Sequence, residues 1–234
     1  MSVKHKGVVV GATGGVGRFI VKTLALDPRV ESVTAVVRKP HENLKEFYLL
    51  SDAPGGEEAA GKIKEEQIDF EKISDEPTKP GIFAGHTIGF SGLAVYTGHV
   101  RSEEEFRHIE VTTNLRAAKL MKLGGVESYA YLSSESVSQD PPKFYTPMFS
   151  RVKGEAERKL QHDVGFKRAT IARPTGIFDR PKDSTTANSL EYFMNYYGRF
   201  LLSTHYGILA EPLLKRWFIQ RLQRRTRPFG QLLI

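Results

Sequence analysis

Three regularly spaced glycines near the start of the chain indicate a site that binds phosphate groups. Gly11, Gly14 and Gly17 lie in the stretch VVVGATGGVGRFI, between an apolar run and the first turn of an expected helix. Glycine at such positions permits a tight turn, close approach of the backbone to a pyrophosphate and close packing of helix on strand. The N-terminus of the helix adds free N–H groups and the positive end of its dipole.

The loop therefore predicts a dinucleotide site, and a plain glycine turn is the alternative. The residues that we assign to the loop are Gly11, Thr13, Gly14, Gly15, Val16 and Gly17.

Two basic residues at the end of the next apolar run indicate which dinucleotide is bound. Arg38 and Lys39 follow in the stretch VVRKP, where a protein that prefers NAD would place an acidic residue for the ribose hydroxyls. Arginine and lysine instead suit the 2′-phosphate of NADP(H). An ordinary solvated basic pair is the alternative interpretation.

The segments that position these residues alternate between strand and helix patterns. Strands are expected over 7–12, 32–37, 62–70, 86–93, 127–134 and 167–174, and helices over 16–26, 102–123 and 149–163. Ser102 and Glu105 form the sequence signature of a capping box at the start of the long helix. Residues 41–62 are polar and predict a long surface excursion.

This alternation predicts an α/β fold, a Rossmann-like doubly wound parallel sheet with helices on both faces. Ligands of such sheets bind at the carboxyl ends of the strands. We expect residues 1–180 to form an NADP(H)-binding domain and residues 181–234 a small helical C-terminal lobe packed on it. Together they would form a single structural domain.

Composition excludes several kinds of site. The 234 residues include no cysteine, so disulfides and thiolate catalysis are excluded. The 7 histidines show no HxH or HExxH spacing, which predicts no metal site. No run approaches the ~18 apolar residues of a membrane span. The start MSVKHK passes at once into an apolar run, so we expect no cleaved secretory signal; an internal targeting signal stays open.

Positive charge is concentrated at the C-terminal end. The chain carries a net charge of +7, and residues 190–234 hold seven basic and two acidic residues, a net +5. Aromatic amphipathic helices are expected over 188–203 and 211–227. This pattern predicts a docking surface for a protein partner or large complex, with an anionic membrane surface as a second candidate. Nucleic acid is disfavoured because no recognition motif accompanies the charge. The alternative is an aromatic helix that covers the sheet edge beside solvated arginines.

Six motifs in order resemble the atypical short-chain dehydrogenase/reductases: GATGGVG, VVRKP, IDFEK, YLSS, VKGEAE and ARPTGIFDR. The chain is most similar to the Tat-interacting-protein oxidoreductases and their fungal mitochondrial relatives. It is more distantly similar to the nucleotide-binding accessory subunit of respiratory complex I. The resemblance covers about residues 6–180.

The resemblance implies roles for matching positions. Asp69 and Phe70 would border the adenine, and Ser91, Gly92 and Leu93 would line the ribose side of the cofactor. Ser133 or Ser134 would orient the substrate. Lys153 would bind the nicotinamide ribose, and Pro174, Thr175 and Gly176 would meet the carboxamide. In each case a structural role is the alternative: a strand-end serine, a solvated lysine, a loop acid.

One departure from this pattern concerns proton transfer. The family places a tyrosine four residues before the lysine, on the same helix face, as the acid for the substrate carbonyl. This chain has Phe149 there, which keeps the ring and removes the hydroxyl. General acid catalysis is typically worth 10²–10⁴-fold, or ~3–5 kcal/mol of barrier. Tyr145 is the replacement candidate, although Pro147 disfavours a helix through it.

The sequence thus predicts an NADP(H)-binding protein with weak or lost catalysis. Its expected role is that of a structural or accessory subunit of a larger assembly, mitochondrial before cytoplasmic. The alternatives are an NADPH-dependent reductase of a small carbonyl substrate, using Tyr145 with Ser133 or Ser134 and Lys153, and a regulatory NADP(H) sensor.

Overall fold

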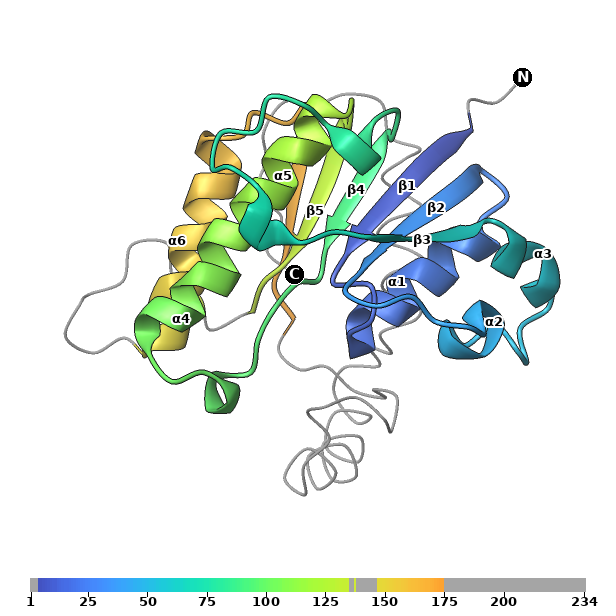
Figure 1. The fold of residues 1–234 in the computed structure, drawn as a ribbon, viewed down its shortest axis with the longest axis horizontal. Coiled ribbons are helices and arrows are strands. Elements are labelled where there is room, and N and C mark those ends of the chain that lie inside the picture. Colours follow the sequence, from blue (N-terminus) through green and yellow to red (C-terminus); the bar gives the residue numbers. More distant parts are fainter. Residues whose placement is uncertain (1–3, 135–136, 138–146, 175–234) are drawn as a thin grey trace, which may run out of the picture. The chain divides into compact units, whose positions relative to one another are not determined.

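Six strands form one parallel sheet in the computed structural model, which describes residues 4–134, 137 and 147–174 (Figure 1). The strands are β1 (His5–Val10), β2 (Val30–Val37), β3 (Ile63–Gln67), β4 (Ile88–Ser91), β5 (Ser128–Leu132) and β6 (Arg168–Ala172). Their spatial order is β3-β2-β1-β4-β5-β6, so the winding direction reverses between β1 and β4. Such a reversal is the point at which ligands bind in doubly wound sheets. The expected Rossmann-like fold is confirmed.

Helices cover both faces of this sheet. The α-helices are α1 (Gly15–Leu26), α2 (Leu44–Phe47), α3 (Gly56–Gly61), α4 (Glu103–Arg107), α5 (Asn114–Leu123) and α6 (Met148–His162). A π-helix spans His108–Thr113, and 3₁₀ turns span Phe70–Lys72, Gly81–Phe83 and Thr97–His99. Gly7 of β1 faces Leu24 of α1, whereas Val8 and Val10 pack in the cluster that holds the α5 and α6 side chains. Because neighbouring strand residues point to opposite faces, α1 and the α5–α6 pair lie on opposite sides.

The long helix expected over 102–123 is present but contains the π-helical segment between α4 and α5. Ser102 caps its start, since its hydroxyl accepts from the amide of Glu105 at 3.2 Å. The returning bond of the capping box goes elsewhere: the Glu105 carboxylate accepts from the amide of Arg101 at 2.8 Å. Gly125 follows the helix with a φ of +100°, a conformation that favours glycine.

The surface excursion expected over 41–62 is wrong in part. It contains α2 and α3, and the side chains of Tyr48 and Leu50 are fully buried. A Cβ on Gly56 would stand 2.1 Å from the carbonyl oxygen of Leu50, so only glycine permits this packing. The segment therefore contributes to the core rather than lying on it.

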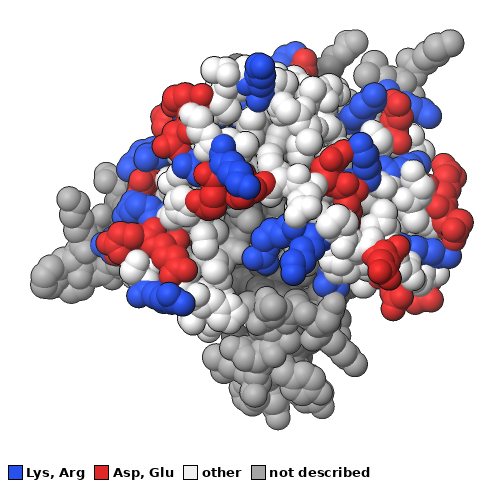
Figure 2. Space-filling model, in the orientation of Figure 1, with Lys and Arg blue, Asp and Glu red and all other residues white. Residues whose placement is uncertain are grey.

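Several expectations fall outside the described residues, namely the C-terminal lobe over 181–234, Tyr145, Thr175 and Gly176. All the described residues belong to one compact unit. On the face shown in Figure 2, basic and acidic side chains are interspersed. Within the described part of the chain, no helix has both the length and the apolar character to cross a membrane. The same residues bring together no group of three His, Asp or Glu suited to a metal ion.

Candidate functional site

The glycine loop joins β1 to α1 at the switch point of the sheet. Gly11 has a φ of +75°, and a Cβ on it would stand 2.5 Å from the amide nitrogen of Leu93. A Cβ on Gly17 would stand 2.0 Å from the carbonyl oxygen of Gly11. Both residues must therefore be glycine for steric reasons. Gly14 is different, because it is exposed and its Cβ would lie 3.4 Å from the nearest atom, the carbonyl oxygen of Gly11.

This loop has the cradle that a pyrophosphate requires. Gly14 is the N-cap of α1 in extended conformation and offers no side chain. Gly15 and Val16 are the first residues of α1, a helix of 12 residues, so their amides belong to its unpaired first turn. Exposed backbone amides at the positive end of a helix favour anionic ligands.

The segment after β4 lies against the glycine loop and is held by Asn114. The hydroxyl of Ser91 donates to the Asn114 side chain at 2.5 Å, and the Asn114 amide donates to the carbonyl oxygen of Leu93 at 3.2 Å. Ser91 is 1% exposed, so its side chain shapes the turn. The backbone of Gly92 and Leu93 lies close to Gly11.

An open hollow lies at the carboxyl ends of β2 and β3. It has a volume of about 500 Å³ and is lined by Arg38, Gln67, Ile68, Asp69 and Lys72. The amide of Gln67 donates to the carbonyl oxygen of Arg38 at 2.7 Å, which joins the two strand ends. The structure therefore brings together Arg38 and Asp69, and it adds Lys72, whose ammonium lies 3.4 Å from the Asp69 carboxylate.

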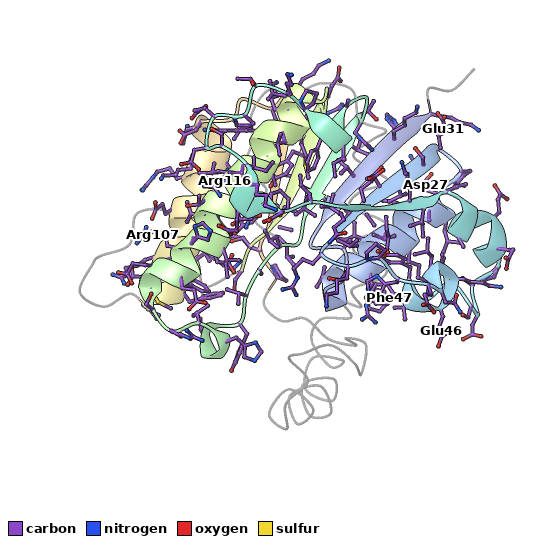
Figure 3. The ribbon with its side chains drawn as sticks, in the orientation of Figure 1. Asp27, Glu31, Glu46, Phe47, Arg107 and Arg116 are labelled. Atoms are coloured by element: carbon purple, nitrogen blue, oxygen red, sulfur yellow. The ribbon has the colours of Figure 1, made fainter. Side chains whose placement is uncertain are left out.

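A stacked column anchors the segment that carries Arg38 and Lys39. The His41 ring stacks on Phe47 of α2 at 3.5 Å between centroids, and the guanidinium of Arg18 in α1 lies 4.0 Å from the Phe47 centroid. Figure 3 labels Phe47 among the side chains. The amide and ring of His41 both bind the Glu65 carboxylate, at 2.6 and 2.8 Å. Tyr48 donates to the same carboxylate at 2.6 Å, and burial followed by this bond raises the pKa of Tyr48. The column fixes the basic pair beside the start of α1.

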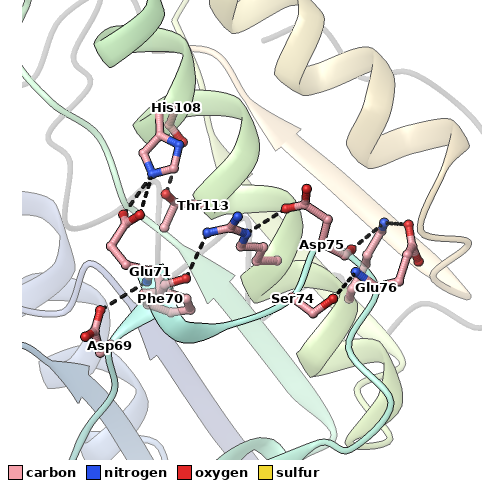
Figure 4. A network of polar contacts seen from close by, with 10 residues as sticks. Asp69, Phe70, Glu71, Ser74, Asp75, Glu76, His108 and Thr113 are labelled. Carbon is pink, nitrogen blue, oxygen red and sulfur yellow. Dashed lines mark hydrogen bonds and ion pairs between the residues drawn. The ribbon is translucent and has the colours of Figure 1, made fainter.

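Ion pairs fix the segment that bears Asp69 and Phe70 to the helices (Figure 4). Arg116 of α5 donates to the carbonyl oxygen of Phe70 at 3.0 Å and to the Asp75 carboxylate at 2.8 Å. His108 of the π-helix binds Glu71 at 2.8 Å. Each exposed pair contributes little energy alone, so the network's main effect is to position the segment.

Lys153 lies in a buried polar cluster instead of solvent. Its ammonium donates to the Glu110 carboxylate at 2.9 Å, and the Tyr131 hydroxyl lies 3.5 Å from it. Lys153 is 4% exposed and Glu110 is fully buried. Burial, and next the Glu110 carboxylate, raise the pKa of Tyr131 well above its ordinary value, so this hydroxyl stays protonated. The alternative of a solvated helix lysine is wrong.

Phe149 lies one helical turn before Lys153 and presents its ring to the ammonium. The Lys153 nitrogen is 5.7 Å from the Phe149 centroid, and the ring also lies 6.1 Å from that of Phe106. The expected juxtaposition on α6 is therefore present, but the ring offers no proton. Tyr145 cannot be placed because it lies outside the described residues.

The two serines after β5 differ in burial. Ser133 is 5% exposed, and its hydroxyl donates to Glu157 of α6, which also accepts from Arg173. This occupies the Ser133 hydroxyl in a structural contact. Ser134 is half-buried, so of the two it has the greater access to a substrate. Pro174, the last described residue, follows Arg173 at the end of β6.

Three residues of this site escaped the sequence interpretation: Glu110, Asn114 and Glu157. Each stands on the apolar face of an expected helix, and a polar residue on such a face is a signal that was available. Glu157 follows Lys153 by four residues, so the two share a face. Glu110 and Asn114 lie outside the six motifs, and Glu157 ends the motif VKGEAE without a role that the resemblance implies, which explains why the three were missed.

No known protein-family profile matches the chain. Two relatives are named "Protein FMP52, mitochondrial". The one from Debaryomyces hansenii is 24% identical over 209 residues, covering 88% of this chain and 80% of the relative. The one from Candida albicans is 25% identical over 177 residues, covering 75% and 69%.

Solved structures share the fold at low identity. A thiolation-reductase di-domain from an archaeal non-ribosomal peptide synthetase has a TM-score of 0.62 at 14% identity over 82% of this chain. A UDP-N-acetylglucosamine 4-epimerase from Methanobrevibacter ruminantium has a TM-score of 0.56 at 17% identity over 86%. This chain spans only 58% and 64% of those two proteins. The oxidoreductase ylbE from Lactococcus lactis has a TM-score of 0.52 at 16% identity, with 86% of each chain covered.

Proposed function

We propose that this chain is an NADP(H)-binding protein of the short-chain dehydrogenase/reductase type. The observation that carries the proposal is the glycine cradle at the switch point, where Cβ atoms on Gly11 and Gly17 would collide with backbone. Gly15 and Val16 would hold the pyrophosphate through their amides, Gly14 would let it approach the backbone, and Lys153 would hold the nicotinamide ribose. When bound, the nicotinamide supplies a hydride or accepts one.

The proposed preference for a 2′-phosphate rests on the hollow at the carboxyl ends of β2 and β3. Arg38 and Lys72 both line it, and they offer two cations within one open cavity. Guanidinium groups bind phosphate in bidentate fashion, which favours NADP(H) over NAD(H). Lys39 is exposed beside Arg38 and adds charge to the same region.

Replacing Arg38 tests this specificity. We expect Arg38→Ala to raise the Kd for NADPH by about 10- to 100-fold, since a charge-assisted contact contributes about 1.5–3 kcal/mol. The Kd for NADH should stay within a factor of about two. Fluorescence titration with each nucleotide gives the ratio of the NADPH Kd to the NADH Kd. Lys64→Ala, at an exposed lysine of β3, is the control. An equal loss for both nucleotides would contradict the assignment.

We propose further that catalysis is weak or lost. Phe149 stands where a proton donor is required, and the Lys153 ammonium is already neutralised by Glu110. The residues described here thus suit cofactor binding better than proton transfer. Following the names of the relatives, we place the protein in mitochondria. There it would serve as an accessory subunit, docked through its basic residues 190–234.

A second candidate function is that of an NADPH-dependent carbonyl reductase, favoured by the presence of Lys153 and the half-buried Ser134 in the site. One comparison separates the two functions. The accessory role predicts NADPH binding without oxidation across a panel of small carbonyl compounds, and sedimentation of the native protein in a large complex. Turnover that Tyr145→Phe abolishes, in a protein that sediments as a monomer, would instead establish the reductase.

A further inference from the structure

A buried carboxylate on the π-helix joins the two sides of the candidate cofactor site. Glu110 is fully buried, and its Oε2 accepts from the Lys153 ammonium at 2.9 Å and from the Tyr131 hydroxyl at 3.4 Å. Its Oε1 accepts from the backbone amide of Val95 at 3.1 Å. The three donors come from α6, from β5 and from the segment after β4.

Burial makes the charge of this carboxylate necessary. An ammonium in a low-dielectric interior stays protonated only when a countercharge compensates its lost hydration. Among the described residues, the titratable groups that face Lys153 are Glu110 and Tyr131, with Glu157 next along α6. Tyr131 is neutral, and the Glu157 carboxylate binds Arg173. Glu110 is therefore the group that neutralises Lys153.

The second oxygen gives Glu110 a separate effect on the site. Val95 follows Leu93 closely, and the backbone around Leu93 contacts Gly11 of the glycine loop. One side chain thus connects the segment expected on the ribose side with the lysine expected to bind the nicotinamide ribose. We propose that Glu110 is a positioning residue for the cofactor site, which holds the Lys153 ammonium charged and in register with the segment after β4. This inference rests on the proposed NADP(H) binding.

Glu110→Gln isolates the charge, because glutamine keeps an oxygen for the Val95 amide. Without the countercharge, burial favours the neutral amine of Lys153, increasingly so as the pH rises. We expect the ratio of the NADPH Kd of E110Q to that of the wild type to rise by about tenfold or more between about pH 6 and pH 9. Glu127→Gln, at an exposed glutamate just before β5, should keep this ratio near one throughout. Glu110→Ala also removes the acceptor for the Val95 amide. The ratio of its NADPH Kd to that of the wild type should therefore exceed the ratio for E110Q even at about pH 6.

A ratio for E110Q that does not change with pH would overturn the inference while leaving NADP(H) binding intact. If the wild type binds no NADPH, the proposed function fails. The role of Glu110 can then be tested without ligand, from the free energy of unfolding as a function of pH. The unfolded chain would bind a proton at Lys153 that folded E110Q does not. The unfolding free energy of E110Q should therefore rise relative to the wild type between about pH 7 and pH 10. Parallel curves for the two proteins would overturn the inference.

Discussion

Gly17→Ala should strongly lower the free energy of unfolding of this protein. The added Cβ would lie 2.0 Å from the carbonyl oxygen of Gly11 and within 3 Å of two further backbone carbons. Backbone atoms cannot swing aside as a side chain does, so β1 and α1 must separate. Overpacking a core position costs about 1–3 kcal/mol, and this contact stands at the upper limit or beyond it. Urea unfolding followed by circular dichroism measures the loss.

Gly14→Ala is the matched variant in the same loop. Its Cβ would lie at an ordinary contact distance of 3.4 Å and point to solvent, so the unfolding free energy should change by less than about 1 kcal/mol. The same methyl group stands where the pyrophosphate would approach the backbone. We expect folded Gly14→Ala protein to lose at least about tenfold in NADPH affinity. Unchanged affinity in a folded variant would remove the glycine cradle as the phosphate site.

Glu157→Ala should be the second severe substitution. The carboxylate is fully buried and accepts from Ser133 and, in bidentate fashion, from Arg173. Its removal leaves the guanidinium without its partner at the point where α6, β5 and β6 meet. Breaking a buried pair from one side typically costs about 3–5 kcal/mol. The shift of the urea midpoint at constant m-value reports this loss.

Two further variants test whether the loss in Glu157→Ala comes from the unpaired charge of Arg173. Glu155→Ala, on the same helix, removes a carboxylate from a surface network with Arg107 and Lys159, and should cost about 1 kcal/mol or less. The double variant Glu157→Ala with Arg173→Ala should cost less than the sum of the two single variants, because no unpaired charge remains. Additive losses would show that the two residues act independently.

The sequence carries most of the information about the sheet. The run GVVV and the glycines after it place β1, the turn and α1 within two residues of where they lie, because burial on both faces and glycine geometry are local properties. The spacing of the later runs predicts the remaining parallel strands. The core residues Tyr48 and Leu50 were missed, since their apolar run FYLL is only four residues long within a polar stretch and becomes buried only through contacts distant in sequence.

The site is less predictable than the sheet. The glycines and Arg38 occupy the expected edge because motifs specify their backbone position. The partner of Lys153 is Glu110, 43 residues earlier in the chain, and the partner of Ser133 is Glu157. Such pairings depend on how two helices rotate about their axes over the sheet. No local pattern encodes that rotation, so a resemblance supplies roles for single residues but not their partners.

The rotation of the long helix has an unusual origin in the π-helix at His108–Thr113. A segment of this kind contains one residue more than an α-helix of the same length, and each residue turns an α-helix by about 100°. Glu110 lies within the segment and Asn114 follows it, so both side chains owe their direction to this extra residue. Deletion of one residue here would restore regular geometry and leave the composition almost unchanged. It would also turn either Glu110, the partner of Lys153, or Asn114, the partner of Ser91, away from the sheet. The π-helix is locally less stable than an α-helix, and it keeps two contacts in place at once: Glu110 with Lys153 and Asn114 with Ser91.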